Sequence, residues 1–357
     1  MKIIPSSEHQ IYVGNGSLNI LKEVIKGYSA EQIVVLADEN TCRDCYPMLP
    51  IKFAEKIIVI PTGEEYKDIF TAIKVWEQLL QHKINRNGLI INLGGGVVGD
   101  LGGFCASVWK RGIDFIQIPT SLLAMVDASC GGKTGINLDG IKNQIGAFKT
   151  PLSVIVDPIF LNTLPQREFL SGIAEMLKHA IISEDKRYFQ QLSEIETPTP
   201  DNISPLIEQA ITIKNNIVMQ DPNEKNIRRI LNFGHTIGHA IESWSQTTKS
   251  PLLHGEAIAL GMNYEIQLAH AQQLISQTTA TQYTTFIQKF FHHLNIESIP
   301  TDTLFNIMQH DKKNASENIS FVLPLENGNF DLDVRVSCEE IEKIFTYSLS
   351  SVCNSKN

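Results

Sequence analysis

The sequence predicts an α/β N-terminal domain with a Rossmann-like, mainly parallel sheet, followed by an all-helical C-terminal domain with a small β-hairpin. Short β-branched runs alternate with helical patterns in the first part of the chain, which is typical of a parallel sheet covered by helices. Helical periodicity dominates after Asp157-Pro158. We therefore expect one domain over residues 1–160 and a second over residues 161–357.

Five strands are expected in the N-terminal domain. Their residues are apolar on both faces, as in sheets that helices cover on both sides. Glycine or polar residues follow most of them, and ligands bind beyond the carboxyl ends of strands in open α/β sheets. The expected strands are Gln32–Ala37, Lys56–Ile60, Leu89–Leu93, Phe115–Ile118 and Ser153–Val156.

The C-terminal domain is expected to begin with a helix that Thr163 caps, because Gln166 follows three residues later. Residues 197–205 are expected to form a loop. Asn327-Gly328 lies between two alternating runs and predicts a hairpin, and Ser337 with Glu340 predicts the cap of a last helix. The other expected helices are Leu164–Ile182, Ile203–Gln220, Ile227–Trp244, Gly255–Leu274 and Thr281–His293.

Composition narrows the class of protein. The chain has 357 residues, 43% of them hydrophobic, and a net charge of −9, which disfavours a nucleic-acid or anionic-membrane partner. No run reaches the ~18 apolar residues of a membrane span, and the start, MKIIPSSEHQ, lacks the apolar segment of a secretory signal. A cytoplasmic enzyme is expected. Cys42 and Cys45 form a lone C-x-x-C motif, which we interpret as two helix thiols rather than a redox pair.

A glycine-rich segment follows the strand Leu89–Leu93. Gly94, Gly96 and Gly99 match G-x-G-x-x-G, a pattern that lets the backbone approach a pyrophosphate at a helix N-terminus. In the usual dinucleotide fold this motif follows the first strand, whereas here about two βα units precede it. Asp100 and the segment 61–67 add polar groups for a ribose or adenine. The pattern predicts a nucleotide, bound by other than the standard geometry.

The helical part contains candidate metal ligands. Glu175 and Lys178 are three residues apart on one helix face, and His235 and His239 are four apart on another. His254 begins a further helix. One carboxylate, two imidazoles and an open position describe a catalytic zinc site. Spacing alone allows both His235 and His239 as ligands, and it also allows His179 in place of Glu175.

The motifs together resemble those of the 3-dehydroquinate synthases, which belong to the sugar-phosphate cyclases. The resemblance runs over nearly the whole chain, and the matching blocks occur in the same order. They are GGGVVGDLGGF, WKRG, PTSLLAMVDASCGGKTGIN, KNQIGAF, AEMLKH, LNFGHTIGHAIE, LHGEAIA and DKKN. Departures are mild: Ser121, Ala128 and Cys130 replace residues that are usual in the family, and the hydroxyl at position 121 is kept.

The resemblance implies an NAD-binding domain and a helical domain with the site in the cleft between them, and a homodimer. It implies Zn²⁺, with Co²⁺ as the alternative, held by Glu175, His235 and His254, so that His239 faces the substrate and His179 is no ligand. The implied NAD contacts are Asp38, Asn40, Thr62, Gly63, Glu64, Glu65, Tyr66, Lys67, Gly96, Val97, Val98, Gly99, Asp100, Thr120, Ser121, Lys133, Lys142, Phe160, Leu161, Asn162 and Thr163.

The implied catalytic and substrate-binding residues are mostly cationic, as a substrate with a phosphate and a carboxylate requires. Arg111 resembles an arginine that reaches the partner subunit's site. The set is Asp127, Lys133, Lys142, Asn143, Lys178, Lys214, Arg228, Asn232, His239, Arg111 and one of Lys312 and Lys313, with Lys313 preferred.

The implied reaction converts 3-deoxy-D-arabino-heptulosonate 7-phosphate to 3-dehydroquinate and phosphate. It proceeds by transient oxidation with NAD, phosphate elimination, reduction and aldol cyclisation. The nearest alternative is another sugar-phosphate cyclase such as 2-deoxy-scyllo-inosose synthase, whose substrate has no carboxylate. Lys142 and Arg228, the implied carboxylate contacts, argue against it. A dehydrogenase related to glycerol dehydrogenase and a non-catalytic scaffold are further alternatives.

Overall fold

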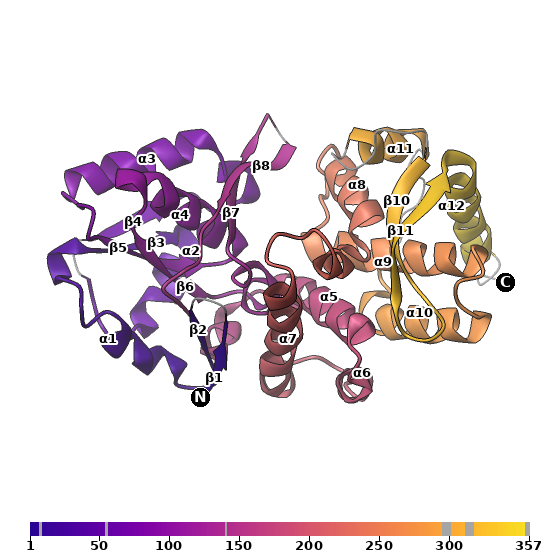
Figure 1. Ribbon diagram of the computed structural model, residues 1–357, viewed down its shortest axis with the longest axis horizontal. Helices are drawn as coiled ribbons and strands as arrows, with labels where there is room; N and C mark the ends of the chain where they lie inside the picture. The colour runs from indigo at the N-terminus through magenta and orange to yellow at the C-terminus, as the bar shows by residue number, and fades with distance from the viewer. Residues whose placement is uncertain (7–8, 54–55, 140, 295–300, 311–317, 354–357) are drawn as a thin grey trace. The chain divides into compact units, whose positions relative to one another are not determined.

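The computed structural model describes residues 1–6, 9–53, 56–139, 141–294, 301–310 and 318–353. The chain divides into two compact units, and the colour in Figure 1 follows the residue number along the chain. Unit 1 contains Met1–Gly172 and Pro198–Met219, and unit 2 contains Ile173–Thr197 and Gln220–Asn357. No helix among the described residues is both long and apolar enough to cross a membrane.

Unit 1 is built on a seven-stranded sheet in the order β1-β2-β9-β6-β5-β3-β4. β1 and β2 are antiparallel, and the other neighbouring strands are parallel. All five predicted strands are confirmed, whereas β1 and β2 were not predicted, because the runs KIIP and QIYV are interrupted by polar residues or proline. The strands are Lys2–Pro5, Gln10–Val13, Ile33–Asp38 (β3), Ile57–Ile60 (β4), Leu89–Gly94 (β5), Asp114–Pro119 (β6) and Ser153–Val156 (β9).

The core of unit 1 lies between this sheet and its helices. β3, β5 and β9 have almost no exposed apolar side chain. Ala72, Val75 and Leu79 form the buried face of α3 and repeat at helical spacing. The helices of this unit are α1 (Leu21–Val24), α2 (Glu39–Asp44), α3 (Ile69–Gln81), α4 (Gly96–Val108) and, in its larger part, α7 (Pro200–Gln220).

Glycine brings α4 close to the sheet. A Cβ atom added at Gly102 would lie 2.6 Å from Cγ of Asn92 on β5, a distance that real side chains do not show. Gly103 is equally restricted, since its added Cβ would lie 2.5 Å from Thr134. The glycines of this helix therefore serve packing as well as the loop that precedes it.

Two features of unit 1 differ from the sequence expectations. β7 (Lys133–Leu138) and β8 (Ile141–Phe148) form an antiparallel pair that was not predicted. The expected loop at residues 197–205 is wrong from residue 200 onward, where α7 begins. Thr199 and Asn202 exchange hydrogen bonds at this helix start, and Pro200 is at the first helical position, where proline is favoured.

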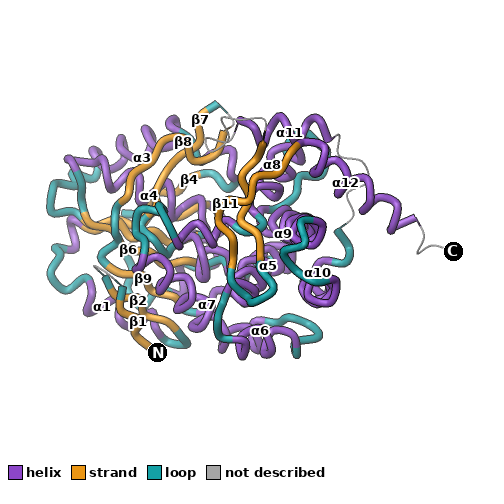
Figure 2. The backbone as a smooth tube through the Cα atoms, turned by 45° about the vertical axis from the view of Figure 1, so that its right-hand side comes forward, coloured by secondary structure: helices purple, strands orange, loops and turns teal. Residues whose placement is uncertain are grey.

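Unit 2 is mainly helical, and the tube in Figure 2 shows its helices around one pair of strands. The hairpin is confirmed: β10 and β11 are antiparallel, and Gly328 in the turn has φ of 82°. The elements are α5 (Gln166–Ile182, shared with unit 1), α6 (Lys186–Ser193), α8 (His235–Ser245), α9 (His254–Ala271), α10 (Gln277–Phe291), α11 (Thr301–His310), β10 (Asn318–Pro324), β11 (Phe330–Ser337) and α12 (Cys338–Cys353).

The predicted helix ends in the second half of the chain give one confirmation, and two predictions are wrong. The predicted cap of the last helix is confirmed, because Ser337 and Glu340 exchange hydrogen bonds. Thr163 does not cap α5: it ends a 3₁₀ helix, Pro158–Thr163, and bonds back to Phe160. The helix predicted over Ile227–Trp244 is broken, since Gly234 (φ 79°) separates the 3₁₀ helix Ile227–Asn232 from α8.

Candidate functional site

The predicted nucleotide residues of unit 1 follow the carboxyl ends of parallel strands. Because β3, β4, β5, β6 and β9 all run in the same direction, these ends meet at one edge of the sheet. Each strand contributes one part of the predicted set: Asp38 and Asn40 after β3, residues 62–67 after β4, residues 96–100 after β5, Thr120 and Ser121 after β6, and residues 160–163 after β9.

The glycine loop forms a small pocket at the N-terminus of α4. Gly94, Gly95, Gly96 and Gly99 line it, together with Gln117 from β6 and Ala128. Gly95 precedes the helix and has no side chain to cap the free N–H groups of its first turn. A Cβ added at Gly96 would lie 3.6 Å from Ala128. The loop thus offers exposed backbone donors and the positive end of a helix dipole to an anion.

Lys67 joins the predicted nucleotide and substrate residues. Its ammonium group lies 2.5 Å from Asp100 on α4 and donates a 2.7 Å hydrogen bond to Asn143 on β8. The Lys67 side chain is buried, whereas Asn143 lies on an edge of the β7–β8 pair and has φ of 54°. Burial raises the pKa of Asp100, although the charge of Lys67 opposes the shift.

Asn137 completes this network, and the sequence analysis did not assign it a role. Its side chain donates to Glu64 (2.9 Å) and accepts from the backbone N–H of Asn143 (3.0 Å). Asn137 is the last residue of the GGKTGIN block, which carried the resemblance, and its membership of that block was the available signal.

A second ion pair, between a lysine and an aspartate, lies in the same unit. The Lys214 ammonium on α7 lies 2.7 Å from a carboxylate oxygen of Asp127 and donates a 2.8 Å hydrogen bond to the backbone carbonyl of Asp127. Asp127 is in a short π-helix, Ala124–Ala128, a feature that is frequent at functional sites. Lys214 is buried, so the pair fixes one oxygen of Asp127 and orients the other.

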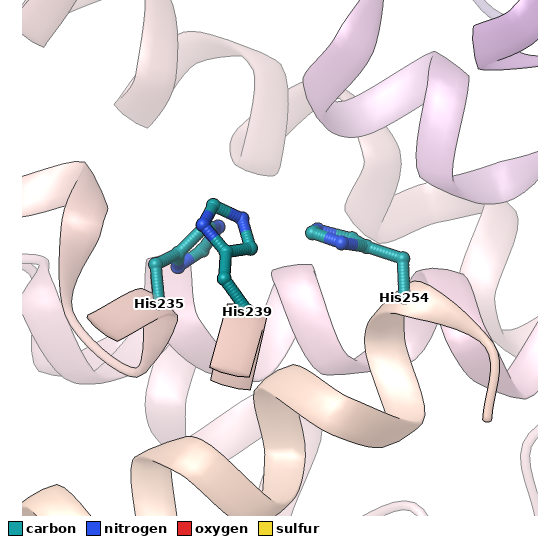
Figure 3. Close-up of side chains that lie close together, drawn as sticks. All are labelled: His235, His239 and His254. Carbon is teal, nitrogen blue, oxygen red and sulfur yellow. The ribbon is translucent and has the colours of Figure 1, made fainter. Parts of the chain in front are cut away.

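The candidate metal ligands lie on three helices of unit 2. Glu175 is on α5, His235 and His239 are in the first two turns of α8, and His254 is the first residue of α9. One ligand atom from each of the three histidines lies within 4.8 Å of the others. Figure 3 shows His235 and His239 side by side, with the ring of His254 pointing toward them from the opposite side.

Glu175 also faces this group. Its Oε1 atom lies 3.5 Å from Nε2 of His235 and 3.6 Å from Nε2 of His254. Neighbouring ligand atoms around a tetrahedral zinc ion with bonds of about 2.0–2.1 Å lie about 3.4 Å apart. The distances from Glu175 Oε1 to the two imidazole nitrogens are close to this value, as ligands of one small divalent cation require. Glu175 is fully buried, His254 is partly exposed and His239 is exposed.

In His235 and His254, the ring nitrogen that does not face Glu175 takes part in a hydrogen bond. Nδ1 of His235 lies 3.0 Å from the carbonyl oxygen of Phe233, and Nδ1 of His254 lies 3.2 Å from Glu242. A carbonyl oxygen can only accept a hydrogen bond, so Nδ1 of His235 must carry the proton. The lone pair of Nε2 is then available to bind a metal. Glu242, which the sequence analysis did not assign, ends the GHTIGHAIE block seven residues after His235.

Charge differs across the cluster. Burial and the nearby Lys178 ammonium lower the pKa of His235, which keeps this imidazole neutral as a ligand must be. Burial opposes protonation of His254 as well, but hydrogen bonds to Glu175 and Glu242 outweigh it and raise the pKa of His254 to about 9. The Lys178 ammonium lies 2.5 Å from Glu175 and donates to the carbonyl of Leu231.

Arg228 and Asn232 lie in the 3₁₀ helix that leads to α8. Arg228 is buried, its guanidinium donates to the carbonyl of Pro222 (2.7 Å), and its backbone N–H donates to Asp221. The Asn232 side chain donates to Glu224 (2.9 Å). Arg111 has a left-handed backbone (φ 72°) beside the end of α4. Lys133 and Lys142 lie on β7 and β8. Lys312 and Lys313 lie outside the described residues.

Comparison with known families matches almost the whole site-bearing region. Residues 57–171 match the model described as 3-dehydroquinate synthase N-terminal, and residues 172–314 match the model described as 3-dehydroquinate synthase C-terminal. A 3-dehydroquinate synthase of Parabacteroides distasonis is 38% identical over 339 residues, which cover 94% of this chain and 96% of that protein.

Solved structures give the same fold. A 2-deoxy-scyllo-inosose synthase complexed with carbaglucose-6-phosphate, NAD⁺ and Co²⁺ superposes with a TM-score of 0.85 at 26% identity, covering 96% of this chain and 98% of that one. A 2-epi-5-epi-valiolone synthase from Streptomyces hygroscopicus with NAD⁺ and Zn²⁺ bound superposes with a TM-score of 0.82 at 23% identity, covering 98% and 99%. From the two family models and the full-length sequence identity, the chain belongs to the 3-dehydroquinate synthase family.

Proposed function

We propose that the chain converts 3-deoxy-D-arabino-heptulosonate 7-phosphate to 3-dehydroquinate and phosphate, as an NAD- and divalent-metal-dependent lyase that forms a carbocycle. Family membership carries the activity, and one observation carries the metal dependence. Glu175 Oε1 lies within 3.6 Å of Nε2 of both His235 and His254, and a hydrogen bond occupies Nδ1 of each ring. The 2-deoxy-scyllo-inosose synthase complex with NAD⁺ and Co²⁺ supports both cofactors.

Glu175, His235 and His254 would hold the metal. A bound divalent cation supplies a Lewis acid that lowers the pKa of the substrate hydroxyl to be oxidised, and NAD supplies a hydride acceptor that is regenerated within the cycle. Lys178 would orient the neighbouring hydroxyl, because Glu175 and the Leu231 carbonyl already fix its ammonium group. His239 is exposed beside His235 and would face the substrate.

The substrate's two anionic groups account for the remaining cations. Arg228 would bind the carboxylate through its planar fork, with Lys142 as a second contact. Lys133 and Asn143 would bind the phosphate, and one of Lys312 and Lys313 would assist them. Asp127, which forms an ion pair with Lys214, would accept or return a proton. We also propose that the enzyme acts in the cytoplasm as a homodimer in which Arg111 reaches the partner subunit's site.

The NAD contacts would be those that follow the five parallel strands. Asp100 and Lys67 would lie near the nucleotide, and the first turn of α4 would face its pyrophosphate. Zn²⁺ suits the donor set of one carboxylate and two imidazoles, and Co²⁺ accepts the same geometry.

The test is a product assay with matched substrates. Purified protein with metal and NAD is given the heptulosonate phosphate, and phosphate and dehydroquinate are measured together. Equal release of both products, lost on chelation and restored by added Zn²⁺ or Co²⁺, is the expected result. Glucose 6-phosphate, which has no carboxylate, is given in parallel. Phosphate release from glucose 6-phosphate, with none from the heptulosonate phosphate, would instead favour the alternative, another sugar-phosphate cyclase.

A further inference from the structure

The start of α8 has no local cap. Gly234 is the N-cap residue and has no side chain, although the first N–H groups of a helix need acceptors when they are buried. His235 follows directly, so the geometry of this turn sets the direction of its ring. His239 lies one turn further along the same helix.

Glu265, thirty residues later on α9, supplies the missing acceptor. Its Oε2 atom accepts a 2.6 Å hydrogen bond from the N–H of Gly234, and its Oε1 atom accepts a 3.3 Å bond from the N–H of Ile237. The two bonded N–H groups lie on either side of His235 in the sequence. Glu265 is fully buried, and a carboxylate at this place is also favoured by the helix dipole.

The two helices are in backbone contact beside this carboxylate. A Cβ atom added at Gly261 would lie 2.1 Å from the carbonyl oxygen of Gly234 and 2.6 Å from the backbone nitrogen of Gly238. The carbonyl of Phe233, just before the turn, accepts the hydrogen bond from Nδ1 of His235. One short segment, Phe233–Ile237, therefore receives contacts from α9 and fixes the His235 ring.

We propose that Glu265 is a positioning residue for the metal site, which aims Nε2 of His235 by holding the first turn of α8. The inference rests on the proposed function, since it assumes that His235 binds the metal. Glu265 touches neither metal nor substrate. Outer partners of this kind alter metal affinity by about 10- to 100-fold when they are changed.

The experiment measures metal binding by the full chain without turnover. Metal-free parent protein and Glu265→Gln are titrated with Co²⁺ by visible absorption and with Zn²⁺ by chelator competition. Glutamine keeps one acceptor oxygen and replaces the other by an NH₂ group that cannot accept. We expect the dissociation constant of Glu265→Gln to rise at least about 10-fold, with a changed Co²⁺ spectrum. Glu265→Asp, which keeps the carboxyl group but is shorter, is measured as the second variant and is expected to weaken binding as well.

Glu326→Gln is the control at another helix start. The exposed Glu326 accepts a 2.6 Å hydrogen bond from the N–H of Ser276, the N-cap residue of α10, and no predicted site residue lies on that helix. This variant should bind Co²⁺ as the parent does. Parent-like affinity and spectrum in both Glu265 variants, or equal weakening in Glu326→Gln, would overturn the proposal. Failure of the parent itself to bind a divalent metal would instead contradict the proposed function.

Discussion

His235 and His239 show how far sequence spacing determines a ligand set. Their four-residue spacing places both on one face of α8, and their ring centroids lie 5.1 Å apart. Spacing does not give the distance to a third helix, so it left both histidines, and both Glu175 and His179, as alternatives. The 3.5 Å distance from Glu175 to His235 and the Phe233 bond to its other nitrogen support His235 as the ligand.

The two histidines should therefore differ when each is replaced. We expect His235→Ala to lose bound metal because it removes a direct donor, and to lose turnover with it. His239→Ala should keep metal near one equivalent per chain but lose turnover at least about 100-fold. Elemental analysis of the purified variants measures the first quantity and the product assay the second. Metal retained in His235→Ala and lost in His239→Ala would reverse the assignment.

The burial of Cys45 predicts that its thiol reacts slowly in the folded protein. It is buried near Thr163, and burial raises the pKa of its thiol to about 11. Because a thiol ionises only near or above its pKa, about one Cys45 in a thousand is a thiolate at pH 8. We expect iodoacetamide to leave Cys45 unmodified in the folded protein at pH 8, with reaction rising toward pH 11. Peptide mass mapping measures this.

Rapid labelling of Cys45 at pH 8 would contradict the protection of its thiol by burial. Unfolded protein at the same pH is the control, since the thiol then returns to its ordinary pKa and should react.

The packing of α8 against α9 governs stability at the scale of elements. Gly261→Ala forces a methyl group to within 2.1 Å of the Gly234 carbonyl, which the helices can relieve only by separating. We expect a loss of about 1–3 kcal/mol in the free energy of unfolding, together with weaker metal binding. Urea denaturation of the metal-free protein measures the first effect. Gly27→Ala is the control, because its added Cβ has no neighbour within 4 Å.

Equal stability of Gly261→Ala and Gly27→Ala would show that the close approach of the two helices does not contribute to folding. Parent-like metal binding in a destabilised Gly261→Ala would separate packing from the site.

Long, periodic elements were predictable from sequence, and short ones were not. β3, β5 and β9 were identified because their apolar runs are continuous, and α5, α9 and α10 because their periodicity spans several turns. β1 and β2 have no continuous apolar run, and the β7–β8 pair lies in a glycine- and lysine-rich segment with no alternation. The break at Gly234 was missed because the apolar period continues across it, while the backbone, held by Glu265, turns.

At the scale of the molecule, the proposed cofactors belong to different units. The glycine loop and the Lys67 network lie in unit 1, and the cluster around Glu175 lies in unit 2. The motifs indicated which residues form each cluster, whereas the contacts within a cluster, such as Lys67 with Asn143, depend on three-dimensional distances that spacing does not contain.

Hydrogen exchange should show the division directly. A ligand that binds only the folded state stabilises it by about 2.7 kcal/mol at one hundred times its dissociation constant. We expect NAD to slow exchange in residues 94–100 and added Zn²⁺ to slow exchange in residues 235–245, measured by mass spectrometry of peptides. Protection of residues 235–245 by NAD alone, with none in residues 94–100, would contradict the placement of the nucleotide.

We propose that NAD is reduced to NADH by the substrate and reoxidised within one catalytic cycle. This claim is tested most directly by giving metal-loaded protein the heptulosonate phosphate with much less NAD than substrate, and counting the products formed per NAD. We predict many molecules of dehydroquinate and phosphate, in equal amounts, for each NAD, and no accumulated NADH. Product limited to one molecule per NAD, with NADH accumulating, would contradict the claim and indicate an ordinary dehydrogenase.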